Sequence, residues 1–258
     1  MTFALLSSIS EVFNCVSGDD SPNLMKVGSI IYSRLSSSRL PRKALMDVSG
    51  RSLIDRVIDA TLRIDSDVTV LATSDQSSDD ELSKVATARQ IVVMRGSLNN
   101  VASRTIETIY QHDLDYFIRI NGDSPILPWR SINAELSNLK AGSQIDLITN
   151  LVPRTFPYGF SVEIVRSQVL IDNYEFFTSE HQEHITKYFY EKLEKFDVKK
   201  ICSKEELRSD DFCSLTVDDD ATLLNVTKLF GQYPDIQDYT ETELLSICKR
   251  FPFNDYKL

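Results

Sequence analysis

The sequence predicts an α/β fold with a mostly parallel sheet flanked by helices. Short apolar runs alternate with segments of helical periodicity along most of the 258 residues, which is the pattern of consecutive βαβ units. Polar and charged residues follow several of the apolar runs directly, and the carboxyl ends of parallel strands are where such sheets bind ligands. The length allows one α/β domain with additions, or two small domains.

The first predicted strand starts at Val27 and ends in a serine-rich loop. This loop carries four cations, Arg34, Arg39, Arg42 and Lys43, in a chain whose net charge is -10. Backbone N–H groups, hydroxyls and cations at the end of a strand suit a polyphosphate. On composition alone, a basic loop that is simply solvated explains the same residues equally well.

Helices and strands then alternate regularly. Helices are predicted over 52–63, 79–88 and 99–111, and strands end at Ser74, Met94 and Ile120. Asn121, Gly122 and Asp123 follow the last of these strands. A carboxylate placed there, beside phosphate-binding cations, commonly holds Mg²⁺. Without the basic loop, Asp123 as a helix cap or turn residue is the better interpretation.

The next part of the chain departs from this alternation. A strand is predicted over 145–150, then a loop with a Pro-x-Gly turn leading into a strand that ends at Val165, and then a single helix over 179–196. Glu183, His184 and Tyr188 are expected close together on that helix. His181 and His184 form an HxxH pair, but two histidines without a third ligand are weak evidence for zinc. A histidine on a helix surface or an interface is the favoured interpretation.

Three consecutive aspartates follow the late strands, which are predicted over 199–202 and 213–217. Asp218, Asp219 and Asp220 precede a helical pattern, and aspartates at a helix start are most often N-caps. Three exceed what capping requires, so one of them is a candidate second Mg²⁺ carboxylate. A final helix over 241–250 is expected to be structural.

Composition excludes several functional classes. The acidic balance argues against general nucleic-acid binding, which requires a basic face, and no apolar run approaches the length of a membrane span. Four cysteines without CxxC spacing are expected to be reduced thiols of a cytoplasmic protein. Residues 1–24 are expected to form an N-terminal extension of unknown role, and residues 25–258 the functional domain.

Seven motifs stand in a fixed order along the chain: SRLSSSRLPRKAL (33–45), ATS (72–74), the RGS run (95–104), RINGDSP (119–125), RTFPYGFSVE (154–163), EHIT (183–186) and LTVDDDATL (215–223). Together they resemble the CMP-sugar cytidylyltransferases over about Val27 to Phe230. The branch that they resemble most contains spore-coat polysaccharide protein F and the acylneuraminate and nonulosonate cytidylyltransferases.

The resemblance implies a Rossmann-like nucleotidyltransferase fold and usually a homodimer, with about 151–195 as acceptor wall or dimer arm. It implies an enzyme that transfers CMP from CTP to the anomeric hydroxyl of a 2-keto sugar acid for surface glycans, releases pyrophosphate and requires Mg²⁺. Partners are then CTP and the acid, with no nucleic acid and no membrane. Pseudaminic, legionaminic, sialic and octulosonic acids stay open as acceptors, although SVE after P-x-G favours a nonulosonic acid.

The resemblance also assigns site residues. The nucleotide is expected at Arg34, Ser37, Arg39, Lys43, Ser74, Arg95, Asn121 and Gly122, with Arg34 and Lys43 catalytic. Magnesium is expected at Asp123 and Asp218. The sugar is expected at Arg154, Tyr158, Glu163, Glu183 and His184, with Arg154 or a nearby cation pairing its carboxylate.

Four positions depart from the family pattern: Ser33 for alanine, Ser36 and Arg42 for glycine, and Asn100 for aspartate. None removes a reactive group, so activity is expected. Two alternatives remain from the sequence: a nucleotidyltransferase with another nucleotide or acceptor, and a catalytically silent relative that acts as a binding subunit.

Overall fold

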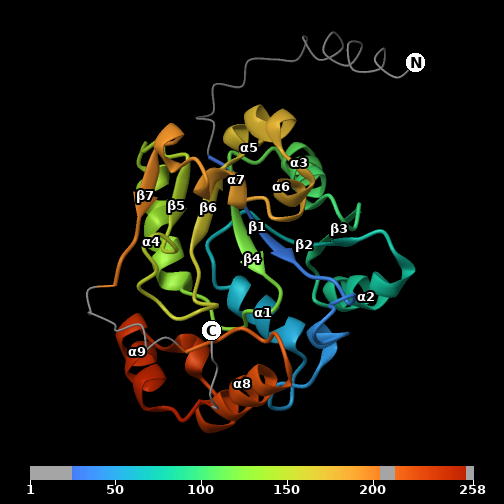
Figure 1. Cartoon of the computed structure of the whole chain (residues 1–258), viewed down its shortest axis with the longest axis vertical. Helices are drawn as coiled ribbons and strands as arrows, with labels where there is room; N and C mark the ends of the chain where they lie inside the picture. The colour runs from blue at the N-terminus through green and yellow to red at the C-terminus, as the bar shows by residue number, and fades with distance from the viewer. Residues whose placement is uncertain (1–24, 204–212, 254–258) are drawn as a thin grey trace.

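A seven-stranded sheet forms the centre of the molecule, with strand order β3-β2-β1-β4-β6-β5-β7 (Figure 1). The computed structural model describes residues 25–203 and 213–253, so the expected N-terminal extension lies outside the described residues. β1, β2, β3 and β4 are mutually parallel, β7 is parallel to β5, and β6 runs antiparallel to both of its neighbours. The predicted mostly parallel sheet is therefore confirmed. The strands are β1 (Val27–Tyr32), β2 (Val68–Ser74), β3 (Val92–Gly96), β4 (Tyr116–Asn121), β5 (Leu147–Thr149), β6 (Glu163–Arg166) and β7 (Val198–Lys200).

Helices cover both faces of the sheet because successive strand residues point to opposite sides. Ile31 packs in the core with α1, α2 and α4, whereas its neighbour Ile30 packs in the core with α3, α5 and α7. A third core joins α8 and α9 at the lower end of the molecule (Figure 1). The helices are α1 (Leu53–Thr61), α2 (Asp80–Ala88), α3 (Val101–His112), α4 (Trp129–Lys140), α5 (Ser167–Asn173), α6 (Ser179–Glu183), α7 (Lys187–Tyr190), α8 (Asp220–Gln232) and α9 (Glu241–Arg250).

The single helix predicted over 179–196 is wrong. The chain leaves helical geometry at His184, with φ -112° and ψ 74°, and the next helix, α7, begins at Lys187. This break lets Ile185 turn inward, where it is 1% exposed, beside Phe189 and the other aromatic residues of this segment. Burial of these side chains outweighs the helical propensity of the sequence.

The strand predicted over 213–217 is also wrong. Its only ladder contact within the described residues is an isolated bridge between Tyr158 and Ser214. The N–H of Leu215 donates to the carbonyl of Tyr158, and the N–H of Val217 donates to the carbonyl of Asp123. Because these acceptors belong to two different loops, the segment does not join the sheet.

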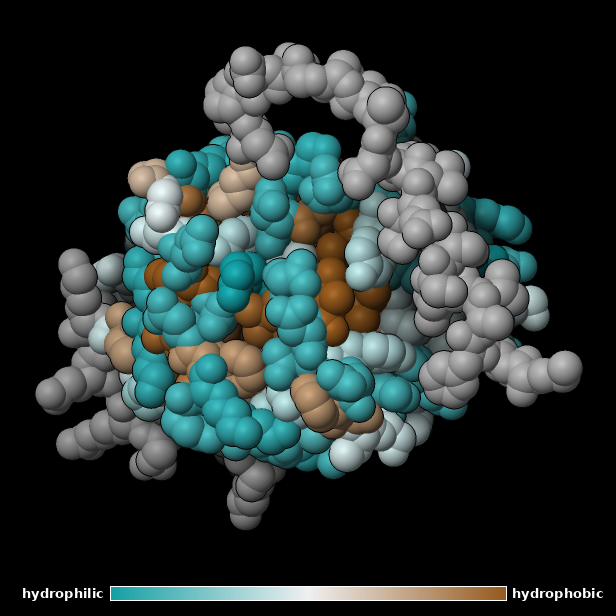
Figure 2. Space-filling model, turned by 90° about the horizontal axis from the view of Figure 1, so that it is seen from above, coloured by the Kyte–Doolittle hydropathy of each residue, from teal (hydrophilic) through white to brown (hydrophobic). Residues whose placement is uncertain are grey.

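The two ends of the sheet differ in character. Viewed from above, where β1 begins, apolar side chains are exposed between hydrophilic ones (Figure 2), and a hollow of about 910 Å³ at this end is lined by Met25, Leu114 and Leu139 among others. A smaller cavity, of about 330 Å³, lies at the opposite end, where the basic loop follows β1. Within the described ranges, no helix combines the length and apolar character needed to cross a membrane.

Candidate active site

The ends of β1 and β4 approach each other closely enough to place Asp123 beside the basic loop. Tyr32 pairs with Asn121 in the sheet, and the N–H of Gly122 donates to the carbonyl of Tyr32 at 2.9 Å. A Cβ at position 122 would lie 2.6 Å from that carbonyl oxygen and 2.6 Å from Cβ of Ser33. Only glycine permits this approach, which explains the Gly-Asp step.

Lys43 is the centre of a cluster drawn from distant parts of the chain. Its Nζ lies 2.8 Å from Oδ2 of Asp123, 3.1 Å from Oδ1 of Asp218 and 2.7 Å from the carbonyl oxygen of Val217. Arg39 reaches the same Oδ1 of Asp218 at 3.2 Å. The hydrogen bond from Val217 N–H to the Asp123 carbonyl, 2.9 Å long, holds the two carboxylate segments together.

A buried carboxylate anchors the basic loop to the sheet. Asp79, fully buried, accepts from the N–H of Leu35 at 2.8 Å and from the hydroxyls of Thr73 and Ser74. The sequence indicated only a helix start at this position. Ser74, expected along the nucleotide, therefore donates its hydroxyl to Asp79.

The cavity of about 330 Å³ brings together most of the predicted site residues. Those lining it are Arg34, Ser37, Arg39, Lys43, Asn121, Gly122, Asp123, Glu183, His184 and Asp218. The remaining expected residues, which are not among its lining side chains, are Ser74, Arg95, Arg154, Tyr158 and Glu163. Tyr32, Arg104 and Arg119 also line it, although sequence reasoning assigned them no role.

The sequence profile of the family described as Cytidylyltransferase matches residues 29–206. This protein belongs to the cytidylyltransferase family. It is therefore an enzyme of the CTP-dependent nucleotidyltransferase type. The resemblance seen in the motifs is confirmed.

Two relatives of this cytidylyltransferase differ in how much of the chain they match. The spore coat polysaccharide biosynthesis protein SpsF of Bacillus subtilis strain 168 is 27% identical over 231 residues, which are 86% of this chain and 94% of SpsF. The 3-deoxy-manno-octulosonate cytidylyltransferase of Chlamydia trachomatis serovar A is 32% identical over 135 residues, 51% of this chain and 52% of that enzyme. Similarity to SpsF thus spans almost the whole protein, and similarity to the octulosonate enzyme about half of it.

Solved structures show the same fold. A cytidylyltransferase of Leptospira borgpetersenii superposes with a TM-score of 0.82 at 22% identity, covering 91% of this chain and 99% of that one. A CMP:2-keto-3-deoxy-manno-octonic acid synthetase complexed with CTP superposes with a TM-score of 0.58 at 18% identity, covering 81% of this chain and 99% of that one. The expected Rossmann-like nucleotidyltransferase fold is confirmed.

The carboxylates around Lys43 suit a hard divalent cation. The carboxylates of Asp123 and Asp218 both contact the ammonium of Lys43, so they lie close enough together to bind one divalent cation between them. Within the part of the chain that the structure describes, no group of three or more His, Cys, Asp or Glu side chains is placed to hold a metal. Mg²⁺ normally takes one or two carboxylates and completes its shell with water and substrate phosphate. The donor set of this cytidylyltransferase fits that pattern.

The wall opposite the basic loop is built from α6 and the sheet. Arg34 pairs with Glu183 at 3.0 Å, which joins the loop to α6. Arg119 of β4 pairs with Glu163 of β6 at 2.6 Å, and the hydroxyl of Tyr190 donates to the same carboxylate at 3.0 Å. Glu163, 1% exposed, thus stands behind Arg119, and burial raises the pKa of Tyr190. Arg119, and not Glu163, is the member of this pair that lines the cavity.

The other expected nucleotide and sugar residues have structural partners outside the cavity. The guanidinium of Arg95 binds the carbonyls of Ser74 and Gln76 at 3.0 and 2.7 Å and the carboxylate of Asp80 at 2.6 Å. The guanidinium carbon of Arg154 lies 4.3 Å from the ring centroid of Tyr158. Arg95 therefore fixes the loop after β2, and Arg154 stacks within the loop before β6.

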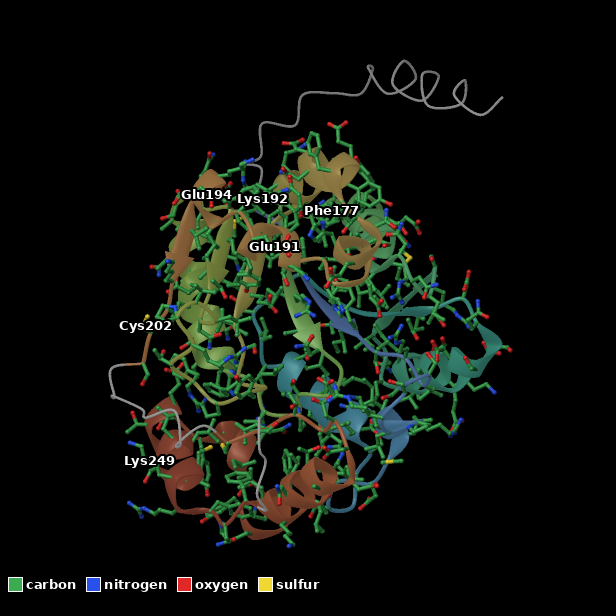
Figure 3. All side chains as sticks on the ribbon, viewed as in Figure 1. Phe177, Glu191, Lys192, Glu194, Cys202 and Lys249 are labelled. Atoms are coloured by element: carbon green, nitrogen blue, oxygen red, sulfur yellow. The ribbon has the colours of Figure 1, made fainter. Side chains whose placement is uncertain are left out.

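The two histidines of the HxxH pair have different environments. His184 lines the cavity, whereas His181 is 7% exposed and its Nε2 lies 2.9 Å from Oε2 of Glu191. Figure 3 places Glu191 near Phe177 in the upper half of the molecule, and the rings of Phe177 and His181 lie 5.8 Å apart. His181 is therefore part of the aromatic packing.

Proposed function

We propose that this cytidylyltransferase transfers CMP from CTP to the anomeric hydroxyl of a 2-keto sugar acid and releases pyrophosphate. The observation that carries the proposal is the position of Lys43, held between Asp123 and Asp218 at the carboxyl edge of the sheet. Cations and carboxylates gathered at one point suit a metal-bound triphosphate. The product serves surface polysaccharide synthesis in this proposal, because the relative of similar length is named for spore coat polysaccharide biosynthesis.

In the proposed reaction a bond forms between the anomeric oxygen and the α-phosphorus of CTP, and the proton of the hydroxyl passes to water. The bond from that phosphorus to the bridging oxygen of the pyrophosphate breaks in line with it. Lys43 and Arg39 stabilise the negative charge that develops on the leaving group, because both cations lie at the same end of the cavity. Arg34, Ser37, Asn121 and Gly122, which also line the cavity, position the nucleotide.

Asp123 and Asp218 are the residues that would hold Mg²⁺. When bound, Mg²⁺ would neutralise phosphate charge and orient the phosphate oxygens. Before the substrate arrives, the ammonium of Lys43 offsets the repulsion between these two carboxylates. The same ammonium is then available to phosphate oxygens, since its side chain is 15% exposed and faces the cavity.

The acceptor lies against α6 in this proposal, where Glu183 and His184 line the cavity. We propose a nonulosonic acid, on the strength of the SVE sequence at 161–163 and of the limited span of similarity to the octulosonate enzymes.

We also propose that 151–195 carries the homodimer contact. Phe176, 58% exposed in this segment, is an apolar side chain available for it.

The first experiment measures pyrophosphate release with Mg²⁺, each of the four NTPs in turn and a panel of 2-keto sugar acids. Release with CTP and one acid would confirm the reaction and identify the acceptor. Release with another nucleotide would contradict the choice of CTP. Absence of both CTP binding and release would favour a catalytically silent subunit.

A further inference from the structure

Five cations line the cavity, and four of them have a carboxylate partner. Arg34 pairs with Glu183, Arg39 with Asp218, Lys43 with Asp123 and Asp218, and Arg119 with Glu163. Arg104 is the fifth. No carboxylate within the described residues forms an ion pair with it. One positive charge in the cavity is therefore left without a counter-ion.

Arg104 is also buried, unlike the other four cations that line the cavity. It is 3% exposed, and its Nε and Nη1 have no hydrogen-bond partner among the described residues. Burial lowers the pKa of its guanidinium, and the nearby charge of Arg34 lowers it further. The residue sits in the first turns of α3, where the helix dipole is positive. Each of these conditions disfavours a cation and favours an anion bound beside it.

The surrounding chain is built to accommodate this side chain. A Cβ at Gly96 would lie 2.5 Å from Cγ of Arg104, so the glycine of the RGS run leaves room for the arginine stem. Asn100 caps α3 by accepting from the N–H of Ser103 at 2.9 Å, which fixes the helix start. The position of Arg104 is thus determined by its neighbours, while its charge is not satisfied by them.

We infer that Arg104 binds the carboxylate of the acceptor, an inference that rests on the proposed function. The shared chemistry is an oxyanion, which either the sugar acid or CTP could supply. The acid is favoured because α3, which carries Arg104, packs against α6, the wall proposed for the acceptor, and because Arg104 forms no ion pair within the Lys43 cluster. A planar guanidinium shielded from water pairs well with a planar carboxylate.

This inference replaces Arg154 as the partner of the acceptor carboxylate. Arg154 is not among the side chains lining the cavity and stacks on Tyr158 instead. Arg119 lines the cavity, but its charge is already matched by Glu163. Arg104 is the cavity cation whose charge an incoming carboxylate would neutralise.

The test compares Arg104→Met with Arg104→Lys, and uses Arg250→Met, on the exposed last turn of α9, as a charge-removal control. In Arg104→Met the KM for the accepted acid rises about 10- to 100-fold, as expected for a lost charge-assisted hydrogen bond. The KM for CTP stays within about twofold, a split that a general loss of folding would not produce. Arg104→Lys gives an intermediate rise because it keeps the charge but loses the planar geometry.

Two further readouts separate binding from a structural role. The thermal midpoint of unligated Arg104→Met equals or exceeds that of the wild type, because a buried unpaired charge is removed. Against the methyl ester of the accepted acid, wild type and Arg104→Met have the same raised KM, since the ester lacks the group that Arg104 binds. A midpoint well below that of the wild type, with both KM values changed, would show that Arg104 is structural and overturn the inference.

The remaining outcomes are distinguishable. A raised KM for CTP with an unchanged KM for the acid would assign Arg104 to phosphate and overturn the inference alone. If the wild type turns over an acid and Arg104→Met has the same KM and kcat, the inference is wrong while the proposed function stands. If calorimetry detects binding of no 2-keto acid to the wild type, and no acid is turned over, both the proposed function and the inference are wrong.

Discussion

The ammonium of Lys43 lies 2.8 Å from Oδ2 of Asp123 and also contacts Asp218. A divalent cation could bind between the same two carboxylates. We expect Lys43→Met to lower kcat about 10²- to 10³-fold, the usual effect of removing one group that stabilises charge in a transition state. Pyrophosphate release measures this. In the same variant Mg²⁺ should raise the thermal midpoint more than it does in the wild type, because Asp123 and Asp218 then repel each other without a cation.

Lys84→Met is the matched control, since Lys84 is exposed on α2. Its turnover and its response to Mg²⁺ should equal those of the wild type.

Asp218→Ala should abolish turnover and leave the fold intact. Rates of Lys43→Met or Asp218→Ala equal to those of the wild type would contradict the roles assigned to these residues.

The aspartates that follow Val217 have separate roles, and Asp219 caps α8. Its carboxylate accepts from the N–H of Thr222 at 2.8 Å, and this hydrogen bond, with one from the Thr222 hydroxyl, lowers its pKa. The stabilisation is present above the unfolded-state pKa of about 3.9 and is lost as the pH falls through the lower folded-state pKa. Wild type should therefore lose stability relative to Asp219→Asn as the pH falls below about 4. Thermal unfolding between pH 2 and 7 measures the difference.

Asp219→Ala tests the cap at neutral pH. Loss of an aspartate N-cap destabilises a helix by about 1 kcal/mol. Because the hydroxyl of Thr222 also accepts from the N–H of Asp218, the substitution should impair turnover as well. If the thermal midpoints of wild type and Asp219→Asn change in parallel with pH, protonation of Asp219 does not determine the loss of stability in acid.

The edge of the sheet that carries the site could be predicted from sequence because its signals are local. An apolar run ending in a basic loop marked β1, and Asn121-Gly122-Asp123 marked the end of β4. In contrast, the antiparallel direction of β6 depends on a long connection, and α5 is too short to show a helical period. These features are set by tertiary packing.

The environments of buried polar groups could not be predicted for a related reason. Asp79 has the sequence context of a helix start, and only the fold shows that it binds the basic loop. Arg104 has the context of an ordinary helix residue, and only the position of Gly96 and the surrounding cavity shows that its charge is unpartnered. Burial and pairing are properties of contacts between segments distant in sequence.

The ion pair between Arg34 and Glu183 links the basic loop to α6 across the cavity. Both side chains are 39% exposed, so the pair should contribute less than about 1 kcal/mol to the free energy of unfolding. Its effect on turnover should be larger, because both residues line the cavity. We expect Glu183→Gln to lower kcat/KM for the acid about tenfold, equivalent to about 1.4 kcal/mol of coupling, with a thermal midpoint close to that of the wild type.

A double-mutant cycle with Arg34→Met checks that the two side chains act together. If the pair is the relevant interaction, adding Glu183→Gln to Arg34→Met should have little further effect on kcat/KM. The tenfold effect should also shrink at high salt, since exposed charges are screened. Additive losses in the cycle would mean that Glu183 binds substrate independently of Arg34.

Arg42 occupies the loop position where the resemblance predicts glycine, and its backbone conformation is one that favours glycine. It has φ 61° and ψ 19°, in the left-handed region, which costs a residue with a Cβ about 1–2 kcal/mol. Its guanidinium pairs with Glu81 at 2.6 Å, but both side chains are more than half exposed, so the pair offsets little of this cost. The departure from glycine is therefore a source of strain in the loop.

Replacing Arg42 by glycine and by alanine separates the two effects. Arg42→Ala keeps the strain and loses the ion pair, so it should be destabilised by up to about 1 kcal/mol. Arg42→Gly loses the same ion pair but relieves the strain, and part of the gain is offset by the greater freedom of glycine in the unfolded chain. We therefore expect Arg42→Gly to be more stable than Arg42→Ala by about 1 kcal/mol in urea unfolding. Equal stabilities of the two variants would show that the left-handed geometry of Arg42 carries no strain.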